Sequence, residues 1–211
     1  YVVHVLTTAI SQFNPSFTID KSSTDLNGGA FAPGDILRYT LLFNNFGNDT
    51  SLNTVLTDVL PFNVGLVPGT LKINGIAKTD ATGDDQAYYD FVNRKVVFNI
   101  GTGATALVGG KVTPGTITVV TFDVVAASSC AVLGCGSTAD NSARIDYVGQ
   151  FSGQALYDSS GVNVSGCIIK GPNSNTITGS CYTPTDTTLV NICPTSATSL
   201  PWGPYAGYTF Y

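Results

Sequence analysis

The chain has 211 residues, of which only 11% are charged, and its formal net charge is -5. Its nine Lys and Arg residues are scattered without any run, which excludes the concentrated cationic surface that nucleic acids and anionic membranes require. No stretch reaches the roughly 20 apolar residues needed to span a bilayer. The charged fraction is far below the roughly 25% of ordinary soluble domains. With abundant Gly, Thr, Ser and Asn, this composition is typical of short strands joined by tight turns.

Strand-like runs, rich in β-branched and aromatic residues and bounded by Gly, Pro and Asn, follow one another along the chain. They cover residues 2–9, 17–21, 36–44, 53–60, 95–100, 117–126 and 139–147. These runs predict an all-β fold, an immunoglobulin-like Greek-key β-sandwich. A helical turn is expected only over residues 84–89. Strand alternation assigns to the core Tyr39, Leu41, Phe43, Phe98, Val120, Phe122, Ile145 and Tyr147.

The composition changes near residue 155, where short β-like pieces begin among Ser, Asn, Gly and Pro. We therefore expect an N-terminal strand or connector over residues 1–12 and the sandwich over residues 13–155. Residues 156–211 would form a cysteine-containing β extension, with a hairpin or irregular segment, or begin a further module. No charged and apolar leader starts the chain, so it is interpreted as a mature product or an excised fragment.

The five cysteines suggest disulfide bonds and hence an oxidising, extracellular compartment. Cys130 and Cys135 lie in CAVLGC, and Cys167 and Cys181 are about one hairpin apart, so both pairs are disulfide candidates. Cys193 would remain unpaired, as a buried thiol or a link to another chain. Free thiols and a zinc site are the alternatives, although zinc usually needs closer cysteine pairs or accompanying histidines.

Residues 17–148 resemble the bacterial and archaeal surface repeat known as the DUF11 family, which includes isopeptide-forming fimbrial domains. The segments that carry the resemblance are FTIDKSS, APGDILRYTLLFNNFGND, VLTDVLP, PGTLKINGIAKTD, VVFNIGTGA, VTPGTITVVTFDV and ADNSARIDY. The resemblance implies an immunoglobulin-like, non-enzymatic module of a large cell-surface protein. It also implies a spontaneous amide bond between Lys21 and Asn141, promoted by a buried acid, Asp58.

Strand periodicity independently places these three polar residues on apolar faces. Lys21 shares a face with Phe17 and Ile19, and Asn141 lies on the apolar face of the last run. Asp58 lies between two leucines, although the opposite face, with Val55 and Val59, is apolar as well. Burial lowers the pKa of a lysine and favours the neutral amine that attacks an amide. A protonated carboxylic acid can polarise the amide carbonyl. The alternative is a solvated Lys21, an Asn141 bonded to backbone and an Asp58 that caps the following turn.

Acidic residues cluster in TDATGDD, where Asp80, Asp84 and Asp85 are candidate calcium ligands. The spacing departs from an EF-hand, and a solvated acidic loop is the alternative. Calcium is the only cofactor that the sequence suggests.

Two triplets match the N-glycosylation pattern, at Asn48 and at Asn163. Asn48 has the better context, since it lies in a predicted surface turn.

Catalytic signatures are missing: the only histidine, His4, lies in an apolar run, and no phosphate-binding loop is present. We therefore interpret the chain as a non-enzymatic structural module or subunit of a prokaryotic surface adhesin, stalk or filament. Its terminal runs, residues 2–9 and 205–211, would pair with strands of neighbouring copies or repeats. The alternative is a carbohydrate-binding or adhesive module that binds host or surface glycans through exposed aromatics such as Trp202, Tyr205 and Tyr208.

Overall fold

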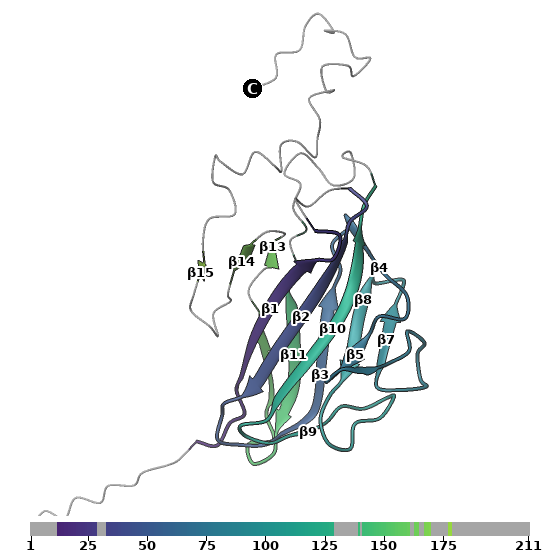
Figure 1. Ribbon diagram of the computed structural model, residues 1–211. Coiled ribbons are helices and arrows are strands. Elements are labelled where there is room, and N and C mark those ends of the chain that lie inside the picture. Colours follow the sequence, from purple (N-terminus) through teal and green to yellow (C-terminus); the bar gives the residue numbers. More distant parts are fainter. Residues whose placement is uncertain are drawn as a thin grey trace, which may run out of the picture.

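The computed structural model describes residues 12–28, 33–128, 139 and 141–160, and the backbone of residues 163–164, 167–169 and 177–178. Two six-stranded antiparallel sheets pack against each other, and a small three-stranded sheet accompanies them (Figure 1). The part of the chain that the structure describes contains no helix, and so none that could cross a membrane. The predicted all-β, immunoglobulin-like sandwich is confirmed.

Each large sheet is built from strands that are distant in the sequence. The first contains, in spatial order, β1 (Phe17–Asp25), β2 (Ile36–Asn45), β10 (Ile117–Ala126), β5 (Lys72–Ile73) and β6 (Ile76–Ala77), with β4 (Val64–Leu66) also paired to β10. The second contains β12 (Ala155–Ser159), β11 (Ala143–Gly149), β3 (Ser51–Val59), β8 (Lys95–Asn99) and β7 (Ala87–Asp90), with β9 (Gly110–Val112) paired to β3. The small sheet consists of β13 (Asn163–Val164), β14 (Cys167–Ile169) and β15 (Ile177–Thr178).

The core lies between the two large sheets, where every second residue of the long strands points inward. All eight residues that the alternation assigned to the core are buried. Aromatic rings connect the layers: Phe17 and Tyr147 meet edge to face with centroids 4.9 Å apart, and Phe98 and Phe122 lie 6.3 Å apart. Such pairs contribute about 0.5–1.5 kcal/mol beyond the burial of their area.

The helical turn expected over residues 84–89 is wrong, because a hydrogen-bonded acidic turn leads directly into β7. Asp85 accepts hydrogen bonds from the backbone N–H groups of Thr79 at 2.9 Å and Ala87 at 2.8 Å. Ala87 then pairs with Phe98 in the second sheet. Short polar side chains that bond nearby backbone compete with helix formation in this way.

The sandwich continues beyond the expected boundary at residue 155. That residue begins β12, which pairs with β11 from Val148 opposite Ala155 to Arg144 opposite Ser159. The strands β4, β5, β6, β7 and β9 also escaped prediction, because runs of two to four residues carry too little periodicity. The strand expected over residues 2–9 lies outside the described residues.

Candidate functional site

Lys21 lies near the middle of β1 and points into the core. Its strand alternates buried and less buried side chains, and Phe17, Ile19 and Lys21 form the inward set. Lys21 pairs in register with Leu41 on β2 and is only 3% exposed. The alternative of a solvated Lys21 is therefore wrong.

Asp58 approaches Lys21 from the opposite sheet. It lies on β3, is 1% exposed, and accepts a hydrogen bond at Oδ2 from Lys21 Nζ. The other carboxylate oxygen, Oδ1, has no hydrogen-bond partner within the described part of the chain. The alternative in which Asp58 caps the following turn is wrong, since its carboxylate is buried and accepts a hydrogen bond from a lysine.

Asn141 completes the cluster from the chain segment just before β11. Ala143 lies opposite Asp58 in the β3–β11 pairing, so Asn141, two residues earlier on the same face, is the diagonal neighbour of Asp58. Asn141 is 2% exposed, and among the described residues neither Oδ1 nor Nδ2 of its amide has a hydrogen-bond partner. The alternative that Asn141 bonds nearby backbone is therefore wrong.

This unsatisfied amide requires an explanation. Leaving a buried polar group without a partner costs about 1–3 kcal/mol, and such groups in native proteins are uncommon. Here the unpaired atoms are Oδ1 and Nδ2 of Asn141 and Oδ1 of Asp58. All belong to residues that share one inward face, beside a buried amine. The arrangement is costly as an ordinary core but suits a reaction between the amine and the amide.

The surroundings of Lys21 favour its neutral form. Its Nζ lies 4.6 Å from the centroid of the Tyr39 ring and 6.0 Å from that of Phe122. Burial lowers the pKa of Lys21 because desolvation disfavours the ammonium, and the attraction of Asp58 opposes this effect without cancelling it. A neutral lysine amine has the lone pair that a nucleophile needs.

A pocket of about 340 Å³ reaches Asn141 from the surface. Its walls include Val59, Phe62 and Val92, which are exposed and apolar. A small molecule released at Asn141 would thus have a short route to solvent.

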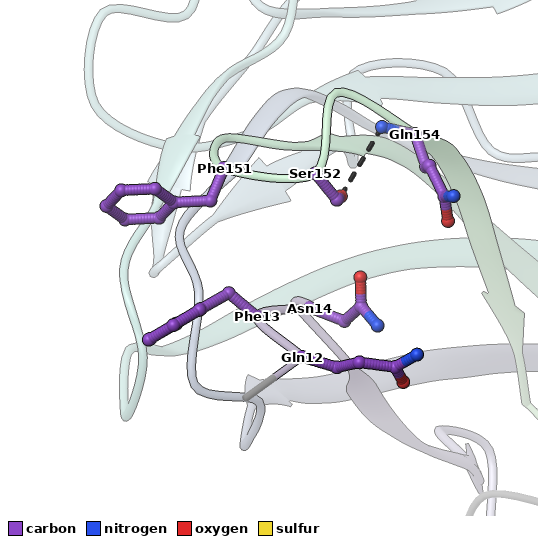
Figure 2. A pocket seen from close by; sticks show the side chains of 6 residues that line it. All are labelled: Gln12, Phe13, Asn14, Phe151, Ser152 and Gln154. Atoms are coloured by element: carbon purple, nitrogen blue, oxygen red, sulfur yellow. Dashed lines mark hydrogen bonds between the residues drawn. The ribbon is translucent and has the colours of Figure 1, made fainter. Parts of the chain in front are cut away.

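A second pocket, of about 270 Å³, lies where the segment before β1 meets the turn between β11 and β12. Figure 2 shows the rings of Phe13 and Phe151 at one end and the amides of Gln12, Asn14 and Gln154 at the other. The two ring centroids are 5.4 Å apart. None of its described lining residues is acidic or basic, and together they offer a contact surface of aromatic rings and amides.

The three aspartates proposed as calcium ligands take part in hydrogen bonds within their loop. Asp80 accepts a hydrogen bond from the Gly69 N–H at 2.7 Å, and Asp84 accepts one from the Thr79 hydroxyl at 2.7 Å. No group of three His, Cys, Asp or Glu residues able to hold a metal occurs among the residues that the structure describes. These carboxylates, including that of Asp85, stabilise the loop.

The glycosylation candidates have different environments. Asn48 is exposed, but its amide donates to the Gln12 carbonyl and accepts from the Asn14 N–H, both at 3.0 Å. Asn163 lies in β13, and its side chain is outside the described part.

The disulfide candidates are untested. Cys167 lies in β14, and its side chain is not described. The other four, Cys130, Cys135, Cys181 and Cys193, lie outside the described residues.

Sequence reasoning missed the contact role of Tyr39, which was assigned only to the core. Its hydroxyl donates a hydrogen bond to the Ala139 carbonyl at 3.3 Å, while its ring contacts Lys21. The available signal was strand periodicity. Tyr39 and Leu41 share one face of β2, and Leu41 pairs with Lys21 of β1.

Comparison with known proteins supports the fold at low sequence identity. No family model and no curated protein matches the chain, so membership of the DUF11 family is not confirmed. The full-length major pilin SpaD from Corynebacterium diphtheriae matches with a TM-score of 0.50 and 14% identity, covering 70% of this chain and 34% of SpaD. This chain therefore spans about a third of the length of SpaD and shares an immunoglobulin-like sandwich with it.

Two further structures have lower TM-scores. The major pilin subunit BcpA of Bacillus cereus matches with a TM-score of 0.47 and 15% identity, covering 71% of this chain and 40% of BcpA. The collagen-binding domain of surface protein RspB from Erysipelothrix rhusiopathiae gives 0.42 and 16%, covering 70% of this chain and 46% of that one.

Proposed function

We propose that this chain is a non-enzymatic structural module of a cell-surface pilus, stalk or adhesin, reinforced by an internal amide bond between Lys21 and Asn141. One observation carries the proposal: a buried lysine is bonded to a buried aspartate, whose diagonal neighbour just before β11 is a buried asparagine amide with no hydrogen-bond partner in the described chain. The sandwich shared with the pilin SpaD is consistent with this role.

The reaction needs only these three side chains. A proton passes from the Lys21 ammonium to the Asp58 carboxylate, and the neutral pair is favoured where water is excluded. Lys21 Nζ then attacks Cγ of Asn141, while protonated Asp58 donates a hydrogen bond to Oδ1. The Nζ–Cγ bond forms and the Cγ–Nδ2 bond breaks. Asp58 relays a proton from Nζ to Nδ2, which leaves as ammonia, and Asp58 is unchanged.

The bond would join the two sheets and relieve the unsatisfied amide. Lys21 belongs to the first sheet, whereas Asp58 belongs to the second and Asn141 directly precedes β11 of the same sheet. Because Lys21 lies in the first described strand and Asn141 just before β11, the bond would carry tension between distant parts of the sandwich. That property suits a module of an extended fibre.

Intact mass spectrometry of the full chain tests the bond. We expect the wild type to be lighter than its sequence mass by one ammonia molecule, and the peptides that contain Lys21 and Asn141 to be linked. Lys21→Met, Asn141→Ala and Asp58→Ala should each retain the full mass expected for their sequence. Lys95→Met, which removes a half-buried lysine of β8 outside the cluster, should still lose ammonia. A wild type with its full sequence mass would overturn the proposed bond.

We further propose that the module acts at the cell surface and assembles with neighbouring copies or repeats through strand pairing. Within the described sandwich, β1 pairs only with β2 and β12 only with β11, so both lie at sheet edges. An edge strand that lacks a second strand partner can accept one from another chain. Deletion of residues 1–9 or of residues 203–211 tests the two proposed connectors. If the deleted segment is the connector, polymers should be lost while the thermal unfolding midpoint of the sandwich stays unchanged. Normal polymers would show that the segment is not the connector.

A further inference from the structure

A groove of about 320 Å³ lies where the edges of the two large sheets meet, away from the Lys21 cluster. One wall comes from the β5–β6 hairpin, and the other comes from the end of β8 and from β9. Lys78 and Lys111 both line it, and we name it the lysine groove. No acidic residue is among the described residues that line the groove, although the chain as a whole is acidic.

Hydrogen bonds hold the Lys78 side chain and the Lys111 backbone, and neither side chain forms an ion pair among the described residues. Lys78 Nζ donates to the Gln86 Oε1 atom at 2.8 Å, which leaves its remaining N–H donors for a ligand. Lys111 is exposed, and its backbone is fixed by two hydrogen bonds with Thr102, at 2.9 and 3.0 Å. The salt bridges found among the described residues use Lys21, Arg38 and Arg144 and neither groove lysine.

The nearest acidic loop, over residues 80–85, lies outside the lining of the groove. The carboxylates of Asp80, Asp84 and Asp85 accept from the backbone or hydroxyl groups of Gly69 and Thr79. Among the described residues that line the groove, Lys78 and Lys111 are the only charged ones. A cleft whose charged lining is cationic favours anionic ligands.

The remaining walls combine neutral donors and acceptors with apolar side chains. Asn74, Thr102 and Thr116 contribute amide and hydroxyl groups, and Ile76 and Ile117 are 66% and 59% exposed. Hydroxyl-rich ligands with apolar C–H faces match such a surface, and the ammonium groups add a preference for carboxylates. We propose that the lysine groove binds a carboxylate-bearing glycan, with Lys78 and Lys111 on the carboxylates of uronic acid residues.

This inference goes beyond the proposed structural role, and it is independent of the internal amide bond. Binding is measured in solution, whereas the bond is read from the intact mass, so the failure of one leaves the other standing. The surface that the inference uses also differs from the sheet edges proposed for assembly.

Isothermal titration of the full chain with polygalacturonate, a uronic acid polymer, tests the groove. We expect binding that weakens with added salt and no comparable binding of neutral dextran. Lys78→Gln combined with Lys111→Gln should weaken binding by at least about tenfold, as loss of charge-assisted hydrogen bonds implies. The matched control Lys95→Gln makes the same kind of charge change on β8, outside the groove, and should change affinity less than about twofold.

Three results would overturn the proposal. The first is an absence of polygalacturonate binding. The second is an equal loss of affinity in the groove variant and in the Lys95→Gln control. The third is dextran binding as tight as polygalacturonate binding. Polyglutamate separates glycan recognition from a general preference for carboxylates. If it bound as tightly as polygalacturonate and depended on the same two lysines, the site would recognise acidic peptides and the glycan assignment would be wrong. An unchanged thermal midpoint of the double variant should accompany its weaker binding.

Discussion

Lys21 and Tyr39 are in contact within the core, with the Lys21 Nζ atom 4.6 Å from the centroid of the Tyr39 ring. The Tyr39 hydroxyl also donates a hydrogen bond to the Ala139 carbonyl at 3.3 Å. One side chain thus contacts the proposed nucleophile and holds the segment that leads to Asn141. Tyr39 does not take part in the bond chemistry and is a positioning residue.

The Tyr39→Phe variant should keep the ring and lose the hydrogen bond to Ala139. We expect the free energy of unfolding to fall by about 1 kcal/mol, because a buried carbonyl loses its partner. The fraction of freshly synthesised chain that has lost ammonia, followed over time by intact mass, should rise more slowly than in the wild type. A normal rate in Tyr39→Phe would show that this hydrogen bond does not position Asn141.

Loss of the amide bond should lower stability substantially. The bond encloses about 120 residues, and the entropy of closing a loop of that length corresponds to roughly 5 kcal/mol if strain is small. Asn141→Ala should therefore unfold at much lower temperature and denaturant concentration than the wild type. A comparison with Ser142→Ala, at the adjacent position, controls for the local effect of substitution. Equal midpoints for Asn141→Ala and the wild type would be inconsistent with a cross-link.

Stability without the bond should depend on pH through Lys21. Desolvation lowers the pKa of Lys21 from its ordinary value of 10.5. Between the lowered pKa and 10.5, the unfolded chain binds more protons than the folded chain. The unfolding free energy of Asn141→Ala should therefore increase as pH rises through that window.

Urea unfolding at several pH values measures this dependence, and Lys21→Met combined with Asn141→Ala is the control. Burial and the Asp158 carboxylate raise the pKa of Tyr147, which lowers stability at alkaline pH in both variants. The difference in unfolding free energy between the two variants therefore reports the contribution of Lys21 alone. A difference that stays constant or reverses with pH would contradict the lowered pKa of this lysine.

Gly47 should tolerate no side chain. A Cβ atom there would lie 2.5 Å from the Ser16 N atom and 2.8 Å from the Pro15 carbonyl carbon. We expect Gly47→Ala to lower the free energy of unfolding by about 1–3 kcal/mol, because backbone must move to relieve the overlap.

Gly65 is the matched control for that substitution. A Cβ at Gly65 would meet only the Val125 Cγ1 atom, at an ordinary contact distance of 3.8 Å. Gly65→Ala should therefore be neutral or stabilise by a few tenths of a kcal/mol, since alanine restricts the unfolded chain. Thermal unfolding of both variants measures the contrast. Equal effects would indicate that the 12–16 segment moves aside easily.

The inward direction of the cluster could be predicted because strand periodicity depends on sequence alone. Lys21 follows Phe17 and Ile19 at intervals of two, and a shift of one residue would have exposed all of them. Its partner could be expected only through family resemblance. Nothing in the alternation of β3 specifies that Asp58 meets a lysine from another sheet.

Features that depend on pairing between distant segments could not be predicted. Lys78 and Lys111 are brought to one groove by strands whose register is fixed only in the folded sandwich. The helical turn expected before β7 failed for a local reason, since the Asp85 carboxylate bonds the backbone N–H of Ala87. Side-chain bonds of this kind leave little trace in hydrophobic periodicity.

The separation of Lys21 from Asp58 and Asn141 into different layers also determines when the reaction can happen. No single sheet contains both the amine and its target. In a chain with only one sheet formed, the Lys21 amine and the Asn141 amide therefore do not meet. The amide bond would then form after both layers have closed, and hydrolysis of an amide is very slow compared with unfolding. The loss of ammonia from Asn141 would identify each molecule that has folded correctly. Because its chain is cross-linked, that molecule could no longer reach the fully extended conformations of the unfolded state.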